Sequence, residues 1–343
     1  MRRLAIGVAL IIFWFAGVLH VNLAHAVTFP GTSWATRTPS QVGLNRSKLD
    51  EFRNATGNIA GVVIKDGYLI YRWGSASGKF DWASAAKPVH STMLLFALKE
   101  EKIPSVHDQV RNWGWNLNSK DQTMELFHLA NMTSGYALPE APGERWGYND
   151  YAIRLYTRTL YERIFEQTAN TAARHSARLG RLQFQDGSIF SSRQGVGLYT
   201  SPRDFARIGW LWLNKGNWQG RQLLPASYFT NYFKPHVPAS LSRTAGGTDD
   251  YLNIGSFGGG TNQTPIGPGI YGFNFWFNPN RETWPDVPAD VYQANGHWNG
   301  EVLTVFPMQN MVVAWKGRRA TSSNFAGPMN NHLKLLMQAA GSM

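Results

Sequence analysis

The 343-residue sequence contains no cysteine, and this absence excludes several kinds of chemistry. Without a thiol the chain forms no disulfide, has no cysteine nucleophile and offers no cysteine ligand to a metal. No His-x-x-x-His or His-Glu spacing indicates a metal site, so we expect no metal and no cofactor. Gly258-Gly259-Gly260 lacks the Lys-Ser/Thr of a phosphate-binding loop, and no Gly-x-Ser-x-Gly sequence supports an α/β-hydrolase fold.

Acidic residues are scarce, since 22 Asp and Glu face 33 Lys and Arg and leave a formal net charge of +11. The basic residues are scattered along the chain, which is typical of a basic surface rather than of a nucleic-acid site. We therefore expect no nucleic-acid partner.

Long apolar runs are confined to the N-terminus. Two arginines precede an apolar run over 4–18, and Ala24-His25-Ala26 has the small-x-small pattern of a cleavage site. This order predicts that residues 1–26 are a signal peptide. An uncleaved N-terminal anchor is the alternative, because the run is near the lower length limit for spanning a bilayer. Either way the rest of the chain is exported, periplasmic or secreted, and it has no stable membrane span after signal cleavage.

The length and an apolar content of 43% suit a single domain over residues 27–343. A helix is expected over 45–55, followed by strands over 59–64 and 68–73 that Asp66-Gly67 joins as a tight turn. Helical spacing and helix-start signals predict the middle helices, and two strands and a last helix close the chain. These later elements are expected over 84–102, 124–130, 151–166, 202–213, 302–306, 311–315 and 328–340.

The element order predicts an α/β fold of the α+β type. An antiparallel sheet would be built from the N- and C-terminal segments and flanked by helices. This β lobe would take in about 40–83 and 290–343. A helical, loop-rich second lobe would take in about 84–289, with 240–290 mostly loop. A cleft between the lobes is the natural place for a site. The aromatic stretch over 273–284 is expected to pack in the core, and lining the cleft is its alternative role.

Ser84-Ala85-Ala86-Lys87 is the first candidate site element. A spacing of three residues at the start of a helix puts Ser84 and Lys87 on one face. A serine hydroxyl needs a base, and a lysine desolvated in a cleft can serve as one. The free backbone N–H groups at this helix start could hold an oxyanion. Taken alone, the pair is also compatible with a capping serine and a solvated lysine.

Two further elements contain side chains that could take part. Tyr148-Asn149-Asp150 follows a turn-rich segment, and a tyrosine near a lysine can relay a proton to a leaving group. Gly296-His297-Trp298-Asn299-Gly300 precedes a strand. A backbone N–H there could complete an oxyanion hole, while His297 could touch a substrate carboxylate or carbonyl. An ordinary half-buried tyrosine and a structural histidine are the alternatives.

The three elements together, in this order and spacing, resemble the serine β-lactamase and penicillin-binding-protein superfamily, especially its class C-like esterase and peptidase branch. The resemblance covers about residues 40–340 and includes other segments typical of that superfamily. These segments are Lys65-Asp66-Gly67, Leu129-Ala130-Asn131-Met132-Thr133-Ser134-Gly135, Pro142-Gly143, Gly197-Leu198-Tyr199-Thr200-Ser201-Pro202-Arg203-Asp204-Phe205-Ala206-Arg207 and Asn217-Trp218-Gln219-Gly220-Arg221-Gln222-Leu223-Leu224.

The resemblance implies that Ser84 is the acylated nucleophile, Lys87 its base and Tyr148 a proton relay. Residues 296–300, with the amide of about Trp298, would replace the family's Lys-Thr-Gly strand. Lys316-Gly317 looks similar to it but lies on a later strand.

Two departures from the family pattern bear on the substrate. Asp150 stands where the family usually has Asn, and a carboxylate cannot donate a hydrogen bond to an acyl amide. Beside Lys87 it would also favour the charged lysine. The missing Lys-Thr pair removes the usual anchor for a β-lactam or D-alanyl carboxylate.

We therefore expect a serine hydrolase that acts on a small ester or amide. D-alanyl peptidase or weak β-lactamase activity is the alternative within the enzyme class. A non-catalytic envelope ligand-binding protein on the same fold is the alternative from another class, and the two departures at Asp150 and residues 296–300 favour it.

Overall fold

The computed structural model describes residues 27–187, 189–321 and 323–342. The predicted signal peptide or anchor, residues 1–26, lies outside this described part. Within the part described, no helix is both long and apolar enough to span a membrane.

A seven-stranded antiparallel sheet forms the centre of the fold, in the order β2-β1-β12-β11-β10-β9-β8. The two ends of the chain meet in it, because β1 pairs with β12 and places Val63 opposite Val313. The predicted α/β fold, with an antiparallel sheet drawn from both chain ends, is therefore confirmed. The strands of this sheet are β1 (Ala60–Lys65), β2 (Tyr68–Gly74), β8 (Tyr271–Gly272), β9 (Phe275–Phe277), β10 (Tyr292–Gly296), β11 (Glu301–Phe306) and β12 (Met311–Lys316).

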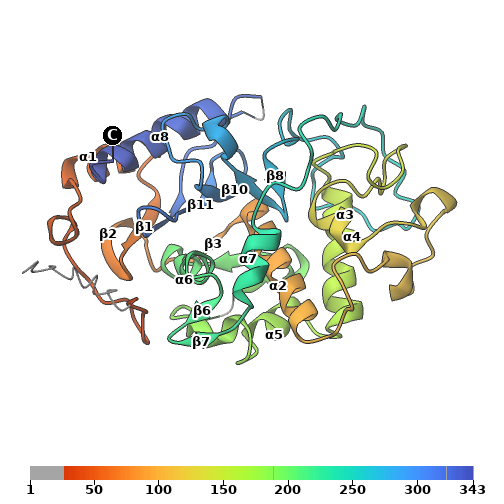
Figure 1. Ribbon diagram of the computed structural model, residues 1–343, viewed down its shortest axis with the longest axis horizontal. Helices are drawn as coiled ribbons and strands as arrows, with labels where there is room; N and C mark the ends of the chain where they lie inside the picture. The colour runs from red at the N-terminus through yellow and green to blue at the C-terminus, as the bar shows by residue number, and fades with distance from the viewer. Residues whose placement is uncertain (1–26, 188, 322, 343) are drawn as a thin grey trace, which may run out of the picture.

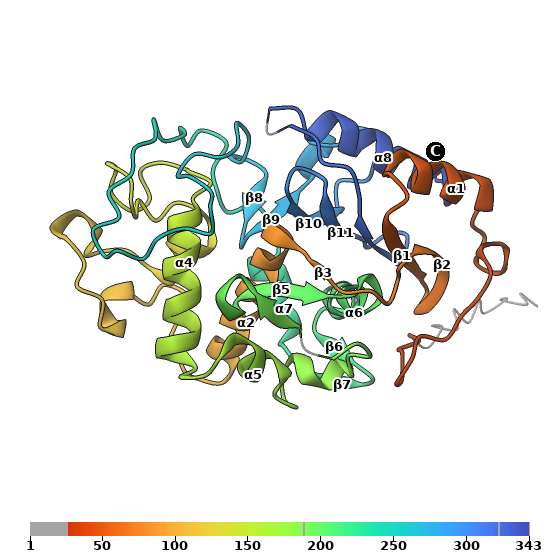
Figure 2. The same ribbon diagram turned by 180° about the vertical axis from the view of Figure 1, so that it is seen from behind.

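Helices cover both faces of this sheet. Helices α1 (Arg46–Ala55) and α8 (Ala326–Ala339) lie side by side on one face, and α6 (Pro202–Leu213) packs on the other (Figures 1 and 2). At Gly209 of α6 a Cβ would lie only 2.6 Å from the Val312 side chain, so this glycine lets the helix approach the sheet closely. The Ser201 hydroxyl caps α6 by accepting the Asp204 N–H at 3.2 Å, as the sequence predicts.

The second lobe lies beside the sheet, and Figure 2 shows α4 within it. Helix α4 continues as a π-helical turn over Thr159–Ile164, so the predicted helix over 151–166 changes its hydrogen bonding midway. The other helices are α2 (Lys87–Lys99), α3 (Leu126–Ala130), α4 (Asp150–Arg158), α5 (Ala169–Arg174) and α7 (Ala226–Tyr232). Small strands outside the main sheet are β3 (Phe80–Asp81), β4 (Phe190–Ser192), β5 (Gly197–Thr200), β6 (Asn217–Trp218) and β7 (Arg221–Gln222).

The lobe boundaries differ from those expected. Strands β8 and β9 belong to the central sheet although they fall within 84–289, and α6 from the same range packs on that sheet. Each of the two strands has only two or three residues, which is too short for an alternating pattern to show in the sequence. Phe273 and Asn274 join them with φ angles of +45° and +65°, and Tyr271 pairs with Trp276 across the turn.

Candidate active site

Ser84 lies on a tight turn that leads into α2. The turn is a short 3₁₀ helix, η2 (Ala83–Ala86), and Ala83 has a φ of +46°, which is costly for a residue with a Cβ. The Asp81 carboxylate steadies the turn by accepting the Ala83 N–H at 2.8 Å. One turn on, the side-chain nitrogen of Lys87 donates a hydrogen bond to the Ser84 hydroxyl at 2.6 Å. The Lys87 side chain is only 5% exposed, so this hydrogen bond is largely screened from water.

The end of β10 packs directly against this turn. At Gly296 a Cβ would lie 2.7 Å from the carbonyl oxygen of Trp82 and 3.1 Å from the nitrogen of Ala85. Only a glycine allows the strand to approach the Ser84 turn so closely. The residues that follow Gly296 are thereby brought to the edge of the same site.

These following residues, 297–299, form a strained turn. His297, Trp298 and Asn299 have φ angles of +39°, +48° and +77°, a left-handed conformation that is costly for side chains with a Cβ. Asn295 holds the turn, because its side-chain oxygen accepts the Asn299 N–H and its amide donates to the Asn299 side chain, both at 2.9 Å. A strained turn fixed in this way presents His297 and Trp298 in one defined orientation.

His297 is paired with a buried carboxylate. Its Nδ1 lies 2.9 Å from a carboxylate oxygen of Glu301, a residue that is 1% exposed. Lys316 donates to the other oxygen of Glu301. Burial by itself raises the pKa of Glu301, but the hydrogen bonds from His297 and Lys316 outweigh it and hold that pKa below its ordinary value. Lys316 thus lies behind the histidine, on the later strand.

Asp150 stands on the opposite side of the Ser84–Lys87 pair. It is the first residue of α4, and Asn149 caps that helix by accepting the N–H groups of Tyr151 and Ala152. One carboxylate oxygen of Asp150 lies 3.7 Å from the side-chain nitrogen of Lys87. The other oxygen accepts two backbone N–H groups, from Phe257 and Gly259, each at 3.1 Å.

Tyr148 is buried between Lys87 and an aromatic wall. The Lys87 nitrogen lies 4.5 Å from the centroid of the Tyr148 ring, within cation–π range. The other side of Tyr148 is supported by Trp276, whose ring stacks at 5.9 Å with an interplanar angle of 23°. Trp276 therefore lines the site, whereas Phe273, Phe275 and Trp284 of the same aromatic stretch are buried in the core.

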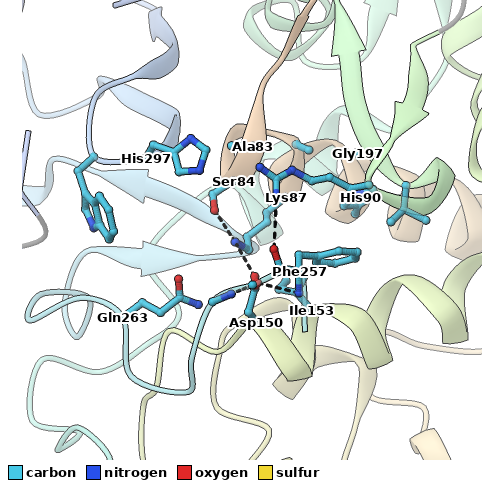
Figure 3. A pocket seen from close by; sticks show the side chains of 16 residues that line it. Ala83, Ser84, Lys87, His90, Asp150, Ile153, Gly197, Phe257, Gln263 and His297 are labelled. Atoms are coloured by element: carbon cyan, nitrogen blue, oxygen red, sulfur yellow. Dashed lines mark hydrogen bonds and ion pairs between the residues drawn. The ribbon is translucent and has the colours of Figure 1, made fainter. Parts of the chain in front are cut away.

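All six residues that the sequence singled out line two adjoining cavities, and Figure 3 shows the larger one. The larger, of about 350 Å³, is lined by Ser84, Lys87, Asp150, His297 and Trp298. The smaller, of about 50 Å³, is lined by Ser84, Tyr148, His297 and Trp298, with Trp276 and Phe325. Ser84 lies where the two cavities meet, and a reacting carbonyl there could have substituents in both.

Sequence reasoning missed several residues that line the larger cavity. They come from four segments far apart in the chain, of which only the glycine-rich run at 258–260 and the family-typical segment that begins at Gly197 were noted from the sequence. These residues are His90, Ile153, Arg193, Val196, Gly197, Phe257, Gly258, Gly259 and Gln263. Across residues 27–187, 189–321 and 323–342, no cluster of three or more His, Asp and Glu side chains could hold a metal ion.

Known proteins resemble this chain in fold and, over one stretch, in sequence. Residues 48–174 match the family model described as Beta-lactamase. A Bacillus anthracis protein provisionally named a 6-aminohexanoate-dimer hydrolase has a TM-score of 0.61 at 18% identity, over 89% of this chain and 87% of its own. A beta-lactamase/D-alanine carboxypeptidase from Yersinia pestis has a TM-score of 0.58 at 16% identity, over 87% and 98%. EstCE1, a hydrolase with promiscuous acyltransferase activity, has a TM-score of 0.57 at 12% identity, over 86% and 98%.

The fold is therefore that of the β-lactamases and penicillin-binding proteins. Within this fold, residues 48–174 match the Beta-lactamase family model, and this match agrees with the resemblance seen in the motifs. None of the curated proteins compared with the chain matches it.

Proposed function

We propose that the protein is a serine hydrolase that cleaves a small ester or amide through an acyl-enzyme on Ser84. The observation that carries this proposal is the 2.6 Å hydrogen bond between the Lys87 amine and the Ser84 hydroxyl at the junction of the two cavities. A buried base in direct contact with a serine is the arrangement that nucleophilic catalysis requires.

In the acylation step, Ser84 attacks the substrate carbonyl and Lys87 accepts the hydroxyl proton. The carboxylate of Asp150, 3.7 Å from Lys87, stabilises the ammonium that forms. The backbone N–H groups of Ser84 and Trp298 hold the oxyanion. Tyr148, whose ring centroid lies 4.5 Å from the Lys87 nitrogen, then gives its hydroxyl proton to the departing alcohol or amine and takes one from Lys87.

The cavities support a small substrate. About 350 Å³ on one side of Ser84 suits a compact polar group, and about 50 Å³ on the other suits a short apolar one. D-alanyl peptidase or weak β-lactamase action is the second candidate, since the Yersinia pestis neighbour carries both names. The residues at the position of the Lys-Thr pair are His297 and Trp298, which offer no lysine for a terminal carboxylate, so small esters and amides come first.

Hydrolysis of a substrate panel tests the proposal. The panel contains p-nitrophenyl acetate, a matching anilide, a D-alanyl-D-alanine peptide and nitrocefin, tested with the parent and with Ser84→Ala. We expect the parent to hydrolyse the acetate fastest and Ser84→Ala to lose on the order of 10⁴-fold in kcat. Ser134→Ala is the matched control, because Ser134 is a buried serine whose hydroxyl accepts the Tyr136 N–H and which lines neither cavity. Equal rates for the parent and Ser84→Ala would refute the proposal.

A fluorophosphonate probe separates the hydrolase from a binding protein on the same fold. We expect the probe to label Ser84 in the parent and Ser134→Ala, and to leave Ser84→Ala unlabelled. A folded parent that takes up no probe would favour the non-catalytic ligand-binding protein.

A further inference from the structure

The pair formed by His297 and Glu301 lies beside Ser84 and takes no part in the acylation steps above. We propose that His297, oriented by Glu301, is the general base that activates water to hydrolyse the acyl group on Ser84. This inference rests on the proposed function and adds a second catalytic base, on the side of Ser84 away from Lys87.

The hydrogen bonding of the imidazole fixes which nitrogen can act. Nδ1 faces a Glu301 oxygen at 2.9 Å, and a carboxylate only accepts hydrogen bonds, so Nδ1 holds the proton. In the neutral imidazole, Nε2 then carries no hydrogen and can accept a proton. The side chain is 30% exposed and lines both cavities together with Ser84, so water reaches this part of the ring. In Figure 3 the His297 ring and the Lys87–Asp150 pair lie on opposite sides of the Ser84 side chain.

The surroundings of Glu301 keep a negative charge behind the imidazole. Lys316 contacts one carboxylate oxygen, and Arg319 lies 3.8 Å from the same oxygen. The second oxygen is committed to His297. Taking such a carboxylate out of water is costly, and placing it behind the base stabilises the imidazolium that proton transfer creates. The strained backbone of residues 297–299 holds the ring in place.

The deacylation step balances in atoms and charge. Nε2 of His297 takes a proton from water, and the water oxygen forms a bond to the acyl carbonyl carbon. The tetrahedral intermediate then breaks its bond to the Ser84 oxygen. The imidazolium returns its proton to that oxygen, which releases the carboxylic acid and leaves Ser84 and His297 as they began.

Stopped-flow hydrolysis of p-nitrophenyl acetate by His297→Gln tests the inference. We expect a burst of about one p-nitrophenol per enzyme, followed by a steady-state rate about 100-fold or more below the parent's. Acetyl-Ser84 should accumulate and appear as a mass increase on the peptide that contains it. Hydroxylamine needs no base to attack an ester, so it should restore turnover.

His107→Gln is the matched control. His107 makes the same contact with Glu125, Nδ1 to carboxylate oxygen at 2.8 Å, but its side chain is 56% exposed and lies outside both cavities. We expect this variant to keep the parent's burst and steady-state rates. Glu301→Gln keeps the histidine but removes the charge, so it should retain the burst and lose about tenfold in the steady state. If Glu301→Gln fails to fold, His297→Gln still decides, because it leaves Glu301 with Lys316 and Arg319.

Three outcomes distinguish a failure of the proposed role of His297 from a failure of the proposed acyl-enzyme on Ser84. A His297→Gln variant with normal acylation and parental turnover overturns the role of His297 alone. A variant whose burst rate and steady-state rate fall equally assigns His297 to acylation and also overturns it. If neither the parent nor the variant acquires an acyl group on Ser84, the proposed function fails, and this inference fails with it.

Discussion

Two histidines, His90 and His297, line the larger cavity, but they differ in their hydrogen-bond partners and in their burial. His90 lies on α2, one turn beyond Lys87, and its Nδ1 is 2.8 Å from the hydroxyl of Tyr161. His297 lies on the turn after β10, and its Nδ1 is 2.9 Å from a Glu301 carboxylate oxygen. One histidine therefore has a neutral partner and the other a charged one.

Burial separates the two histidines further. His90 is 3% exposed and stacks on Phe190 at 5.1 Å. Burial, followed by the charge of Lys87, lowers the pKa of His90 to about 3, so it stays neutral at ordinary pH. His297 is open to the cavities and backed by a carboxylate. The comparison teaches that lining a cavity does not assign a role; the partner of the imidazole and its access to water do.

The largest expected effect tests whether either histidine can substitute for Lys87. Lys87→Met keeps a long, apolar side chain in the buried position but removes the amine. We expect the acylation rate with p-nitrophenyl acetate to fall about 10³-fold. Burial lowers the pKa of His90 to about 3, which makes it a very weak base, and its Nδ1 is engaged by Tyr161, while His297 serves the other side of Ser84. Pre-steady-state kinetics measure this rate directly. A loss of less than tenfold would mean that a histidine or water replaces the lysine.

The next effect concerns stability and sets His90 apart. In the unfolded chain His90 takes up a proton near its ordinary pKa of 6.5, but in the folded protein only near about 3. The contribution of neutral His90 to the free energy of unfolding is therefore fully present above pH 6.5. It decreases as the pH falls from there toward about 3, by about 1.4 kcal/mol per pH unit. His90→Gln has no titrating group at this position and does not lose this stability. The difference between the free energies of unfolding of the variant and the parent should therefore shift in favour of the variant as the pH falls.

Urea unfolding of the parent and His90→Gln at pH 7.5 and at acidic pH measures the difference. Turnover of p-nitrophenyl acetate by the variant at pH 7.5 should stay within a few-fold of the parent's, since His90 has no catalytic step. A difference in unfolding free energy that is independent of pH would contradict the assignment of His90 as a buried, neutral packing residue.

The smallest expected effect concerns Asp150, the carboxylate on the Lys87 side of Ser84. Asp150→Asn keeps an oxygen for the N–H groups of Phe257 and Gly259 and gains an amide N–H. Because this donor can bond to an acyl amide, we expect the anilide-to-ester rate ratio to rise about 5- to 10-fold, as one hydrogen bond allows. Parallel kcat/KM measurements on the two substrates give the ratio. An unchanged or lower ratio would show that Asp150 does not face the acyl group.

The parts of the molecule that follow local rules could be predicted from the sequence. The strand pair around Asp66-Gly67 and the Ser201 cap of α6 depend on neighbouring residues only, and both form as expected. Ser84 and Lys87 likewise meet because three residues make about one turn. Residues 84–87 therefore carried a local signal for the core of the site.

The parts that depend on distant packing could not be predicted. Phe257 donates to Asp150 across 107 positions of sequence, and no pattern near either residue indicates the contact. Strands β8 and β9 join the sheet through aromatic residues in a stretch that is otherwise loop. His297 and Glu301 are four residues apart, but they meet only because the turn between them takes left-handed φ angles, which the sequence does not predict for His-Trp-Asn.

The central claim is that Ser84 forms a covalent acyl-enzyme. Its most direct test is mass spectrometry of the protein quenched during turnover of p-nitrophenyl acetate, followed by peptide mapping. The account predicts a mass increase of one acetyl group on the peptide that contains Ser84, present in His297→Gln at close to one per chain and absent from Ser84→Ala. Turnover with no acyl group on Ser84, or with the acyl group on another residue, would contradict it.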